Sequence, residues 1–134
     1  MAGYSQTPLA KKLGIKPGSR LALDLAPPGW SIPELPDGVV AVAAPAPAEV
    51  VVAFFREDAQ LPGRLPALAE RIFPAGSLWV AWPRRAGGHR SDITENGLRD
   101  HALPLGIVDV KVAAIDEDWS GLKFMWRREL RSAR

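Results

Sequence analysis

The stretch EVVVAFF, residues 49–55, decides the fold class. Its apolar run is uninterrupted from Val50 to Phe55 and is rich in β-branched and aromatic side chains. Such a run is typical of a strand that is covered on both faces, as in the middle of a parallel sheet. An amphipathic segment follows at 61–73, where apolar side chains recur at helical spacing, namely Leu61, Leu65, Leu68, Ala69 and Ile72. The apolar run SLWVAW at 77–82 predicts the next strand, so the alternation of strand and helix favours an α/β sheet.

Two helices are expected to cover the sheet in this central part of the chain. Pro62 suits the first turn of a helix, whereas Pro66 does not suit a helix interior. We therefore expect the regular helix to begin near Leu65, with Pro66 in its first turn. Asp92, followed three residues later by Glu95, resembles a capping box that starts the second helix.

The end of the sheet is predicted to be an antiparallel pair. Residues 107–115 (IVDVKVAAI) and 119–128 (WSGLKFMWRR) flank the acidic turn Asp116–Asp118, which is the pattern of a hairpin. We expect this pair to be added at the edge of the parallel sheet. Asp109 and Lys111 lie two residues apart on the first of these strands, which predicts that both face the same side.

The region before residue 49 predicts two further strands. Residues 20–26 (RLALDLA) form the first, with Asp24 near its end, and residues 39–43 (VVAVA) form the second. The connector APAPAE at 44–49 is shorter than the dozen or so residues that a parallel crossover needs. Strand 39–43 therefore either runs antiparallel to strand 50–55 or is a short stub at the sheet edge, and the sequence leaves both open.

The two ends of the chain flank one expected domain. Thr7 followed by Pro8 is a helix-start pattern, and Gly14 suits a left-handed helix end. This predicts a short N-terminal helical arm at about residues 7–14 and a basic tail at about residues 129–134. A length of 134 residues suits a single compact α/β domain over residues 1–134.

The composition excludes several classes of site. The chain has no cysteine, so it forms no disulfide, thiolate metal site or thiol nucleophile. Its two histidines argue against a His-rich metal site, and we expect no metal. No run approaches the roughly 18 apolar residues of a membrane span, and the N-terminus lacks the apolar core of a secretory signal. We therefore expect a cytoplasmic protein without a membrane partner.

The order of elements from Glu49 to Arg128 resembles the C-terminal half of a class I methyltransferase. In that family too, a strand feeds a helix that ends in a turn similar to 74–76 (PAG). A Leu-Gly pair similar to Leu105-Gly106 then leads into a final antiparallel pair. The resemblance implies a three-layer, Rossmann-like fold of the methyltransferase type. It has a mostly parallel sheet, helices on both faces and a C-terminal antiparallel strand pair.

Longer blocks of the sequence resemble a second family. GYSQTPLAKKLGIKPGSR (3–20), AGSLWVAWPRR (75–85) and DITENGLRDHALPLGIVDVKVAAIDEDWSGLKF (92–124) are similar to an uncharacterised actinobacterial domain of unknown function, DUF 3052. The resemblance implies a cytoplasmic bacterial protein and brings no established activity with it.

The signals of a working methyltransferase are missing from the sequence. A Rossmann-type nucleotide site needs a glycine-rich turn after the first strand, yet residues 24–30 read DLAPPGW. An acid after the second strand would hold the ribose hydroxyls, but no carboxylate appears there until Glu49. Residues 54–58 (FFRED) lack the Asn/Asp-Pro-Pro motif that positions an acceptor amine in this family. These departures argue against S-adenosylmethionine-dependent methyl transfer, and we name no cofactor and no catalytic residue.

Ligands of open α/β sheets bind beyond the carboxyl ends of the parallel strands. Our candidates for ligand or partner binding at this edge are Asp24, Trp30, Trp82, Arg84, Arg85, His89, Arg90, Trp119 and Ser120. Tryptophan faces and arginine guanidiniums together suit flat or anionic ligands. The competing interpretation is that each tryptophan is a core side chain, because an aromatic ring buries a large area. Trp79 and Trp82 are three residues apart on one strand and are expected to face opposite sides.

Three functional hypotheses follow. The first is a small, non-catalytic binding or regulatory protein on a degenerate methyltransferase-like fold, with an unidentified protein or small-molecule partner. The alternative is a ligand-binding enzyme or sensor that holds a nucleotide-like or anionic ligand at the Trp82–Arg85 edge. The least favoured is nucleic-acid association through the C-terminal arginines Arg127, Arg128, Arg131 and Arg134, because the net charge of +2 is small. A homodimer through an exposed sheet edge stays open.

Overall fold

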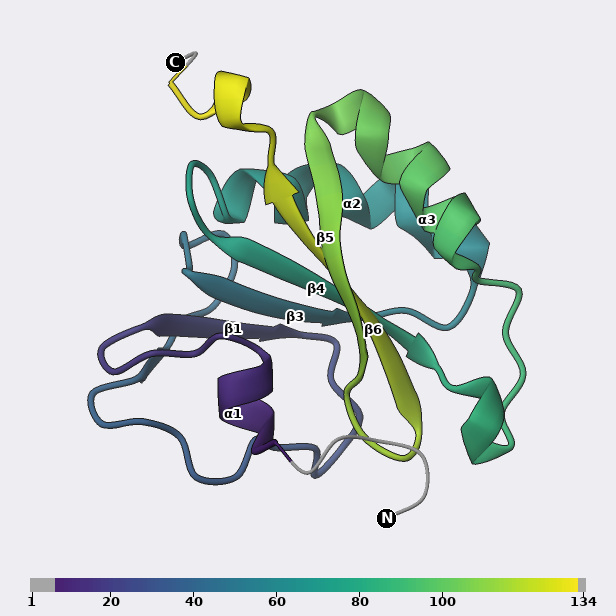
Figure 1. The fold of residues 1–134 in the computed structure, drawn as a ribbon, viewed down its shortest axis with the longest axis horizontal. Coiled ribbons are helices and arrows are strands. Elements are labelled where there is room, and N and C mark those ends of the chain that lie inside the picture. Colours follow the sequence, from purple (N-terminus) through teal and green to yellow (C-terminus); the bar gives the residue numbers. More distant parts are fainter. Residues whose placement is uncertain (1–6, 133–134) are drawn as a thin grey trace.

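The computed structural model describes residues 7–132, in which six strands form one sheet (Figure 1). The strands are β1 (Arg20–Asp24), β2 (Val40–Ala41), β3 (Val50–Phe54), β4 (Ser77–Pro83), β5 (Ile107–Ala114) and β6 (Trp119–Trp126). Their spatial order is β2-β1-β3-β4-β6-β5. The first four strands are parallel, and β6 is antiparallel to both of its neighbours, so β5 points the same way as β4. The expected class, an α/β fold with a mostly parallel sheet, is confirmed.

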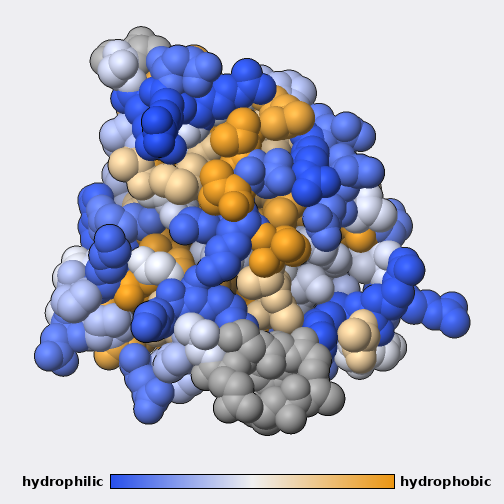
Figure 2. All heavy atoms as spheres, viewed as in Figure 1, coloured by the Kyte–Doolittle hydropathy of each residue, from blue (hydrophilic) through white to orange (hydrophobic). Residues whose placement is uncertain are grey.

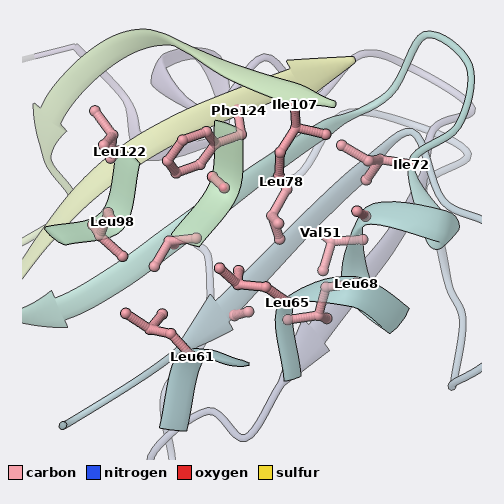
Figure 3. Close-up of a cluster of buried hydrophobic side chains, with 14 of the residues drawn as sticks. Val51, Leu61, Leu65, Leu68, Ile72, Leu78, Leu98, Ile107, Leu122 and Phe124 are labelled. Carbon is pink, nitrogen blue, oxygen red and sulfur yellow. The ribbon is translucent and has the colours of Figure 1, made fainter. Parts of the chain in front are cut away.

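Helices cover the two faces of this sheet unequally (Figure 1). The α-helices are α1 (Leu9–Lys12), α2 (Leu61–Arg71) and α3 (Glu95–Ala102). The 3₁₀ helices are η1 (Asp58–Gln60), η2 (Arg85–Gly87), η3 (Leu103–Leu105) and η4 (Arg128–Leu130). On one face, α2 and α3 pack over the central strands, as Figure 3 shows. On the other face lies the single turn of α1. None of the helices within residues 7–132 combines the length and apolarity that crossing a membrane requires.

The core explains why the central strands carry no polar alternation. Every residue of β3 and of β4 is buried, so the prediction of a strand covered on both faces is confirmed. Side chains that face α2 and α3, such as Val51 and Leu78, join one cluster, and those that face α1, such as Val52 and Trp79, join another. Ile32, from the helix-free connection between β1 and β2, also packs into the second cluster. The proline-rich connection therefore covers the area that a crossover helix would cover in a longer chain.

The closing strands form the predicted antiparallel pair, and the pair lies at the edge of the parallel sheet as expected. β6 lies between β4 and β5, and it is antiparallel to both. The chain thus leaves β4 through α3, places β5 at the outer edge, and returns to fill the gap with β6. The second strand also ends at Trp126 rather than Arg128, because η4 begins at Arg128.

The strand predicted at 39–43 resolves into a short edge strand. β2 contains only Val40 and Ala41, and it pairs with β1 in parallel. β1 lies between β2 and β3 in the sheet, so the connector 44–49 never has to join neighbouring strands. Of the two open alternatives, the edge stub is correct.

The first covering helix begins earlier than expected. α2 starts at Leu61, with Pro62 in its first turn and Pro66 inside the helix. Pro66 is exposed, so the carbonyl that loses its helical partner at residue 62 can be hydrated. The apolar side chains at helical spacing, which include the buried Leu61 and Leu65, therefore outweigh the proline penalty.

The starts of the other two helices also differ from the predictions. Thr94, not Asp92, caps α3, and its hydroxyl accepts a hydrogen bond from the amide of Gly97 at 3.0 Å. Asp92 instead accepts the amide of Asp58 at 2.8 Å. The N-terminal helix begins one residue later than expected, with Pro8 at its N-cap position. Its left-handed end at Gly14, with φ of +81°, is as predicted.

A bulge in β5 separates two side chains that the sequence placed on one face. Asp109 lies opposite Phe124, whereas Lys111 lies opposite Lys123, and Val110 between them has no counterpart on β6. An extra residue in one strand reverses the facing of everything after it. Asp109 consequently meets Arg99 of α3, and Lys111 faces the side that carries α1.

Candidate functional site

The carboxyl ends of β1, β3 and β4 meet the start of β6 at one edge of the sheet. Three aromatic rings pack in series there. The ring centroids of Trp30 and Phe54 are 4.8 Å apart, and those of Phe54 and Trp119 are 4.9 Å apart, both in edge-to-face geometry. Trp30 Nε1 also donates a hydrogen bond to Asp116 Oδ2 at 2.9 Å. Trp30 therefore joins the connection after β1 to the β5–β6 turn. The same side chain packs against the end of β3 at this edge.

A small hollow opens beside these rings. It has a volume of about 180 Å³ and is lined by Pro27, Arg56, Pro83, His89, Asp118 and Trp119; we call it the edge hollow. The guanidinium carbon of Arg56 lies 5.1 Å from the centroid of the Trp119 ring. Arg56 lies two residues after the end of β3 and is exposed, whereas Trp119 is buried. The hollow thus combines an aromatic wall with a cation that water can reach.

The opposite wall of the edge hollow is a histidine–carboxylate pair. His89 Nε2 lies 2.8 Å from Asp118 Oδ1, and both side chains are largely exposed. The backbone amide of Arg84 also donates to the carbonyl of Asp118 at 2.8 Å. Gly87 makes this approach feasible, because a Cβ added there would lie 2.3 Å from the carbonyl oxygen of Glu117. The loop after β4 is therefore packed directly against the β5–β6 turn.

A second hollow adjoins the first. Its volume is about 520 Å³ and it is lined by Arg85, Gly88, His89, Arg90 and Ser91; we call it the loop hollow. His89 lines both hollows. Ser91 Oγ donates to the carbonyl of Arg56 at 2.9 Å, which ties the far end of this loop to the end of β3. Arg85 and Arg90 give the loop hollow a cationic lining.

Four of the sequence candidates lie near this edge without lining either hollow, namely Trp30, Trp82, Arg84 and Ser120. Trp82 is 9% exposed and belongs to the core cluster beneath α2 and α3. Ser120 lies opposite Trp82 in the register of β4 and β6. Trp79 faces the other side and donates Nε1 to the carbonyl of Leu13 at 3.1 Å. The prediction that Trp79 and Trp82 face opposite sides is confirmed, and both are core side chains.

Asp24 stands apart from the hollows, at the end of β1. Arg64 of α2 binds it, with Nη2 2.5 Å from Oδ2. The other terminal nitrogen of Arg64 donates to the carbonyl of Phe54 at 2.7 Å. Asp24 therefore joins β1, β3 and α2, and its carboxylate is already engaged.

Three residues that shape this edge were absent from the sequence candidates. Arg56 is the first charged residue after β3, so the sequence places it at the carboxyl edge, although it is not among the binding candidates. Asp118 belongs to the acidic turn Asp116–Asp118, and Arg64 lies in the segment 61–73 that is predicted to be helical. Nothing in the local sequence predicts their partners, which lie 29 residues from Asp118 and 40 residues from Arg64. Within residues 7–132, no group of three or more His, Asp or Glu side chains is placed to share a metal ion.

A third, apolar hollow lies beside β1 and β2. Its volume is about 510 Å³, and its lining consists of Leu21, Leu23, Ser31, Ile32, Leu35, Ala41, Val42 and Ala43. Leu25, just beyond it, is 69% exposed and has a left-handed φ of 55°. Ser31, Ile32 and Leu35 of the β1–β2 connection form part of its wall, and it holds none of the predicted site residues.

Comparison with solved structures identifies the fold. A fibrillarin pre-rRNA processing protein from Methanococcus jannaschii matches at 12% identity and a TM-score of 0.59, over 92% of this chain and 70% of that chain. A ribosomal protein L11 methylase from Lactobacillus delbrueckii subsp. bulgaricus matches at 9% identity and a TM-score of 0.56, over 90% and 76%. The chain has a Rossmann-like, methyltransferase-type fold.

The likeness does not extend to whole proteins or to sequence. The O-methyltransferase NcsB1 from neocarzinostatin biosynthesis, solved with S-adenosylmethionine, matches at 15% identity and a TM-score of 0.51. That match covers 66% of this chain, which spans only 34% of the NcsB1 chain. No protein-family model matches the sequence, and no curated protein sequence matches it.

The residues at the expected cofactor positions do not fit S-adenosylmethionine. After β1 the chain offers no glycine-rich turn, and the carboxylate of Asp24 is held by Arg64. Glu49, the first acid after β2, lies at the amino ends of the strands, where it pairs with Arg20. Neither position has the glycine-rich turn or the ribose-binding acid that such a site uses. We therefore derive no chemistry through this cofactor.

Proposed function

We propose that the chain is a small non-catalytic binding protein, built as one domain on a degenerate methyltransferase-like fold, that holds a flat anionic ligand in the edge hollow. The observation that carries this proposal is the position of Arg56 over Trp119, at the mouth of a hollow that His89 also lines. An aromatic face attracts a planar group, and a guanidinium offers paired donors to a carboxylate or phosphate.

The dimensions of the two hollows limit the ligand. Pockets for drug-sized molecules usually enclose roughly 300–1,000 Å³, so the edge hollow, at about 180 Å³, admits one ring or one anionic group. The adjoining loop hollow, at about 520 Å³, supplies Arg85 and Arg90 for a second part of the same molecule. A nucleotide-like ligand, with a base and a phosphate, matches this two-part arrangement.

The lack of an assembled catalytic set supports binding without chemistry. His89 and Asp118 pair with each other, and the hydroxyl of Ser91, on the same loop as His89, donates to the backbone of Arg56. Methyl transfer is the rival function, because the solved structures of this fold described above include methyltransferases. Transfer of a labelled methyl group from S-adenosylmethionine to any component of a cell extract would overturn the non-catalytic part of the proposal.

Ligand binding is tested with AMP and with benzoate, a flat carboxylate without phosphate. Binding to the folded state alone raises stability by about 2.7 kcal/mol when the ligand is at 100 times its Kd, which a thermal-unfolding scan detects. We expect stabilisation by AMP that Arg56→Gln and His89→Gln each weaken at least tenfold in Kd. Arg128→Gln, which removes an exposed arginine of η4, is the matched control.

Two results would overturn the proposal that the edge hollow binds a flat anion. If neither AMP nor benzoate raises the melting temperature, the proposed ligand class is wrong. If Arg128→Gln weakens binding as much as Arg56→Gln, attraction to general positive charge explains the result and the edge hollow is not the site.

The cellular setting is also a proposal. The cysteine-free composition supports a cytoplasmic location, and the blocks at 3–20, 75–85 and 92–124 support a relationship to the actinobacterial domain of unknown function DUF 3052. Fractionation of the native host, followed by detection of the chain in the cytosolic fraction, tests the location.

A further inference from the structure

Lysines from three elements gather on the face of the sheet that carries α1. Lys111 of β5 lies directly opposite Lys123 of β6 in the antiparallel register. Lys123 reaches the end of α1, where a methyl group added at Gly14 would lie 3.8 Å from Nζ. Lys12 of α1 is buried and donates Nζ to the carbonyl of Ala114 at 2.8 Å. We call Lys12, Lys16, Lys111 and Lys123 the lysine face.

The same region is visible on the surface. Figure 2 shows hydrophilic side chains over the middle of this side of the molecule, between α1 and the hydrophobic side chains along β5. Lys16 and Lys111 are exposed, and Lys123 is partly so. An anion from solution can therefore reach the cluster.

The opposed pair Lys111 and Lys123 is held together without a matching carboxylate in residues 7–132. Like charges directly opposite each other on antiparallel strands are destabilising. Among residues 7–132, neither Lys111 nor Lys123 has a carboxylate within 4.0 Å. Burial, followed by the positive charges of Lys111 and Lys16, lowers the pKa of Lys123. Burial also lowers the pKa of Lys12, with Lys111 and Arg84 adding to it and Asp116 opposing them.

The bulge at Val110 maintains this imbalance. Without it, Asp109 would face the same side as Lys111 and could neutralise it. With it, Asp109 pairs with Arg99 on the opposite face at 3.0 Å. The fold thus turns the nearest carboxylate on β5 away from the cluster.

We propose that the lysine face binds the phosphates of a compact polyphosphate anion. Lysine ammonium groups act as point charges that suit phosphate oxygens. Their side chains converge from α1, β5 and β6 on one small area, which matches a short chain of phosphates. An extended nucleic-acid backbone would instead need charges spread along a line. This site is separate from the edge hollow and shares no lining residue with it.

Inorganic tripolyphosphate is the probe, titrated into the intact chain by calorimetry at low and at moderate salt. We expect binding that weakens as salt rises, because screening reduces charge attraction. The variant Lys111→Gln/Lys123→Gln should lose affinity at least tenfold. Arg127→Gln/Arg128→Gln removes the same charge from the C-terminal region and should change affinity less than threefold. Lys111→Gln/Lys123→Gln should leave the binding of AMP unchanged, which separates this site from the edge hollow.

Three outcomes would overturn the proposal. The first is no heat of binding for the wild-type chain at low salt. The second is an equal loss for the two double variants, which would mean non-specific attraction. The third is duplex DNA binding as tightly as tripolyphosphate with sensitivity to Arg127→Gln/Arg128→Gln, which would assign the charge to nucleic acid. A thermal scan of each unliganded variant verifies that it is folded.

Discussion

Arg64 of α2 and Asp24 at the end of β1 form a partly buried ion pair, with Nη2 2.5 Å from Oδ2. The same guanidinium donates to the carbonyl of Phe54 at 2.7 Å and lies 3.8 Å from the centroid of the Phe55 ring. One side chain therefore ties two parallel strands to the helix that covers them. In nucleotide-binding Rossmann folds the end of β1 is open to the ligand, whereas here Arg64 occupies it by binding Asp24.

Asp24→Asn should lower the free energy of unfolding by about 1–3 kcal/mol, because it leaves the partly buried guanidinium without its charged partner. Urea denaturation monitored by circular dichroism measures the change. The matched control is Asp100→Asn, an exposed carboxylate of α3, which should stay within about 0.5 kcal/mol of the wild type. Equal effects of the two substitutions would contradict a structural role for the pair.

Gly87→Ala should destabilise the protein by about 1–3 kcal/mol, because a Cβ would lie 2.3 Å from the Glu117 carbonyl and push the loop away from the turn. Binding at the edge hollow should weaken with it, since His89 lies on the displaced loop. Gly63→Ala is the control of opposite sign: nothing lies within 4 Å of its Cβ. That substitution, inside α2, should raise stability by about 0.4–1 kcal/mol. A melting temperature that rises in both variants would show that the loop at Gly87 can move away from Glu117 without loss of stability.

The features that could be predicted from the sequence depend on short segments. The apolar run of β3 and the helical spacing of apolar residues in α2 predict which side chains are buried without any knowledge of distant contacts. Both elements are present in the structure. The position of Asp24 at a strand end followed from the same kind of pattern. The order of β5 and β6 in the sheet did not, because a hairpin can join either side of an edge and only the fit against β4 decides.

The candidate site was predictable as a region and not as a set of contacts. The rule about carboxyl ends of parallel strands pointed to the correct edge, where His89 and Trp119 line the hollow. The partner of each is set by tertiary register: Asp118 meets His89 only because the loop at Gly87 packs on the β5–β6 turn. The bulge at Val110 was equally hidden, since no glycine or proline marks it in the sequence.

The Arg20–Glu49 pair predicts that the free energy of unfolding depends on pH in the acidic range. Hydrogen bonds from the Arg20 side chain, and then from its backbone amide, lower the pKa of Glu49 from 4.5 to about 2. A carboxylate with a lowered pKa in the folded state adds stability above pH 4.5 and loses it as pH falls toward 2. Both side chains are 47% exposed, so after solvent screening the contribution is less than about 1 kcal/mol. Glu49→Gln should therefore flatten this part of the stability curve.

Urea midpoints of the wild type and Glu49→Gln, compared from pH 2 to pH 6, measure this contribution. The difference should be present at pH 6 and vanish near pH 2. Glu34→Gln is the control, since Glu34 is exposed and makes no salt bridge within residues 7–132. A constant difference across this range would mean that the Glu49 side chain acts through packing and not through its charge.

Lys111→Gln should stabilise the unliganded protein by about 0.2–1 kcal/mol at low salt, because it removes a like-charge neighbour directly opposite Lys123. The pKa of Lys123 is lowered from 10.5, so its charge destabilises the folded state at neutral pH. That penalty is relieved as pH rises toward 10.5, where the lysine loses its proton in both states. The gain from Lys111→Gln should consequently shrink at high pH and also in high salt. Denaturant midpoints at two pH values and two salt concentrations measure the effect, and a variant less stable than the wild type at neutral pH and low salt would show that Lys111 is held by a favourable contact.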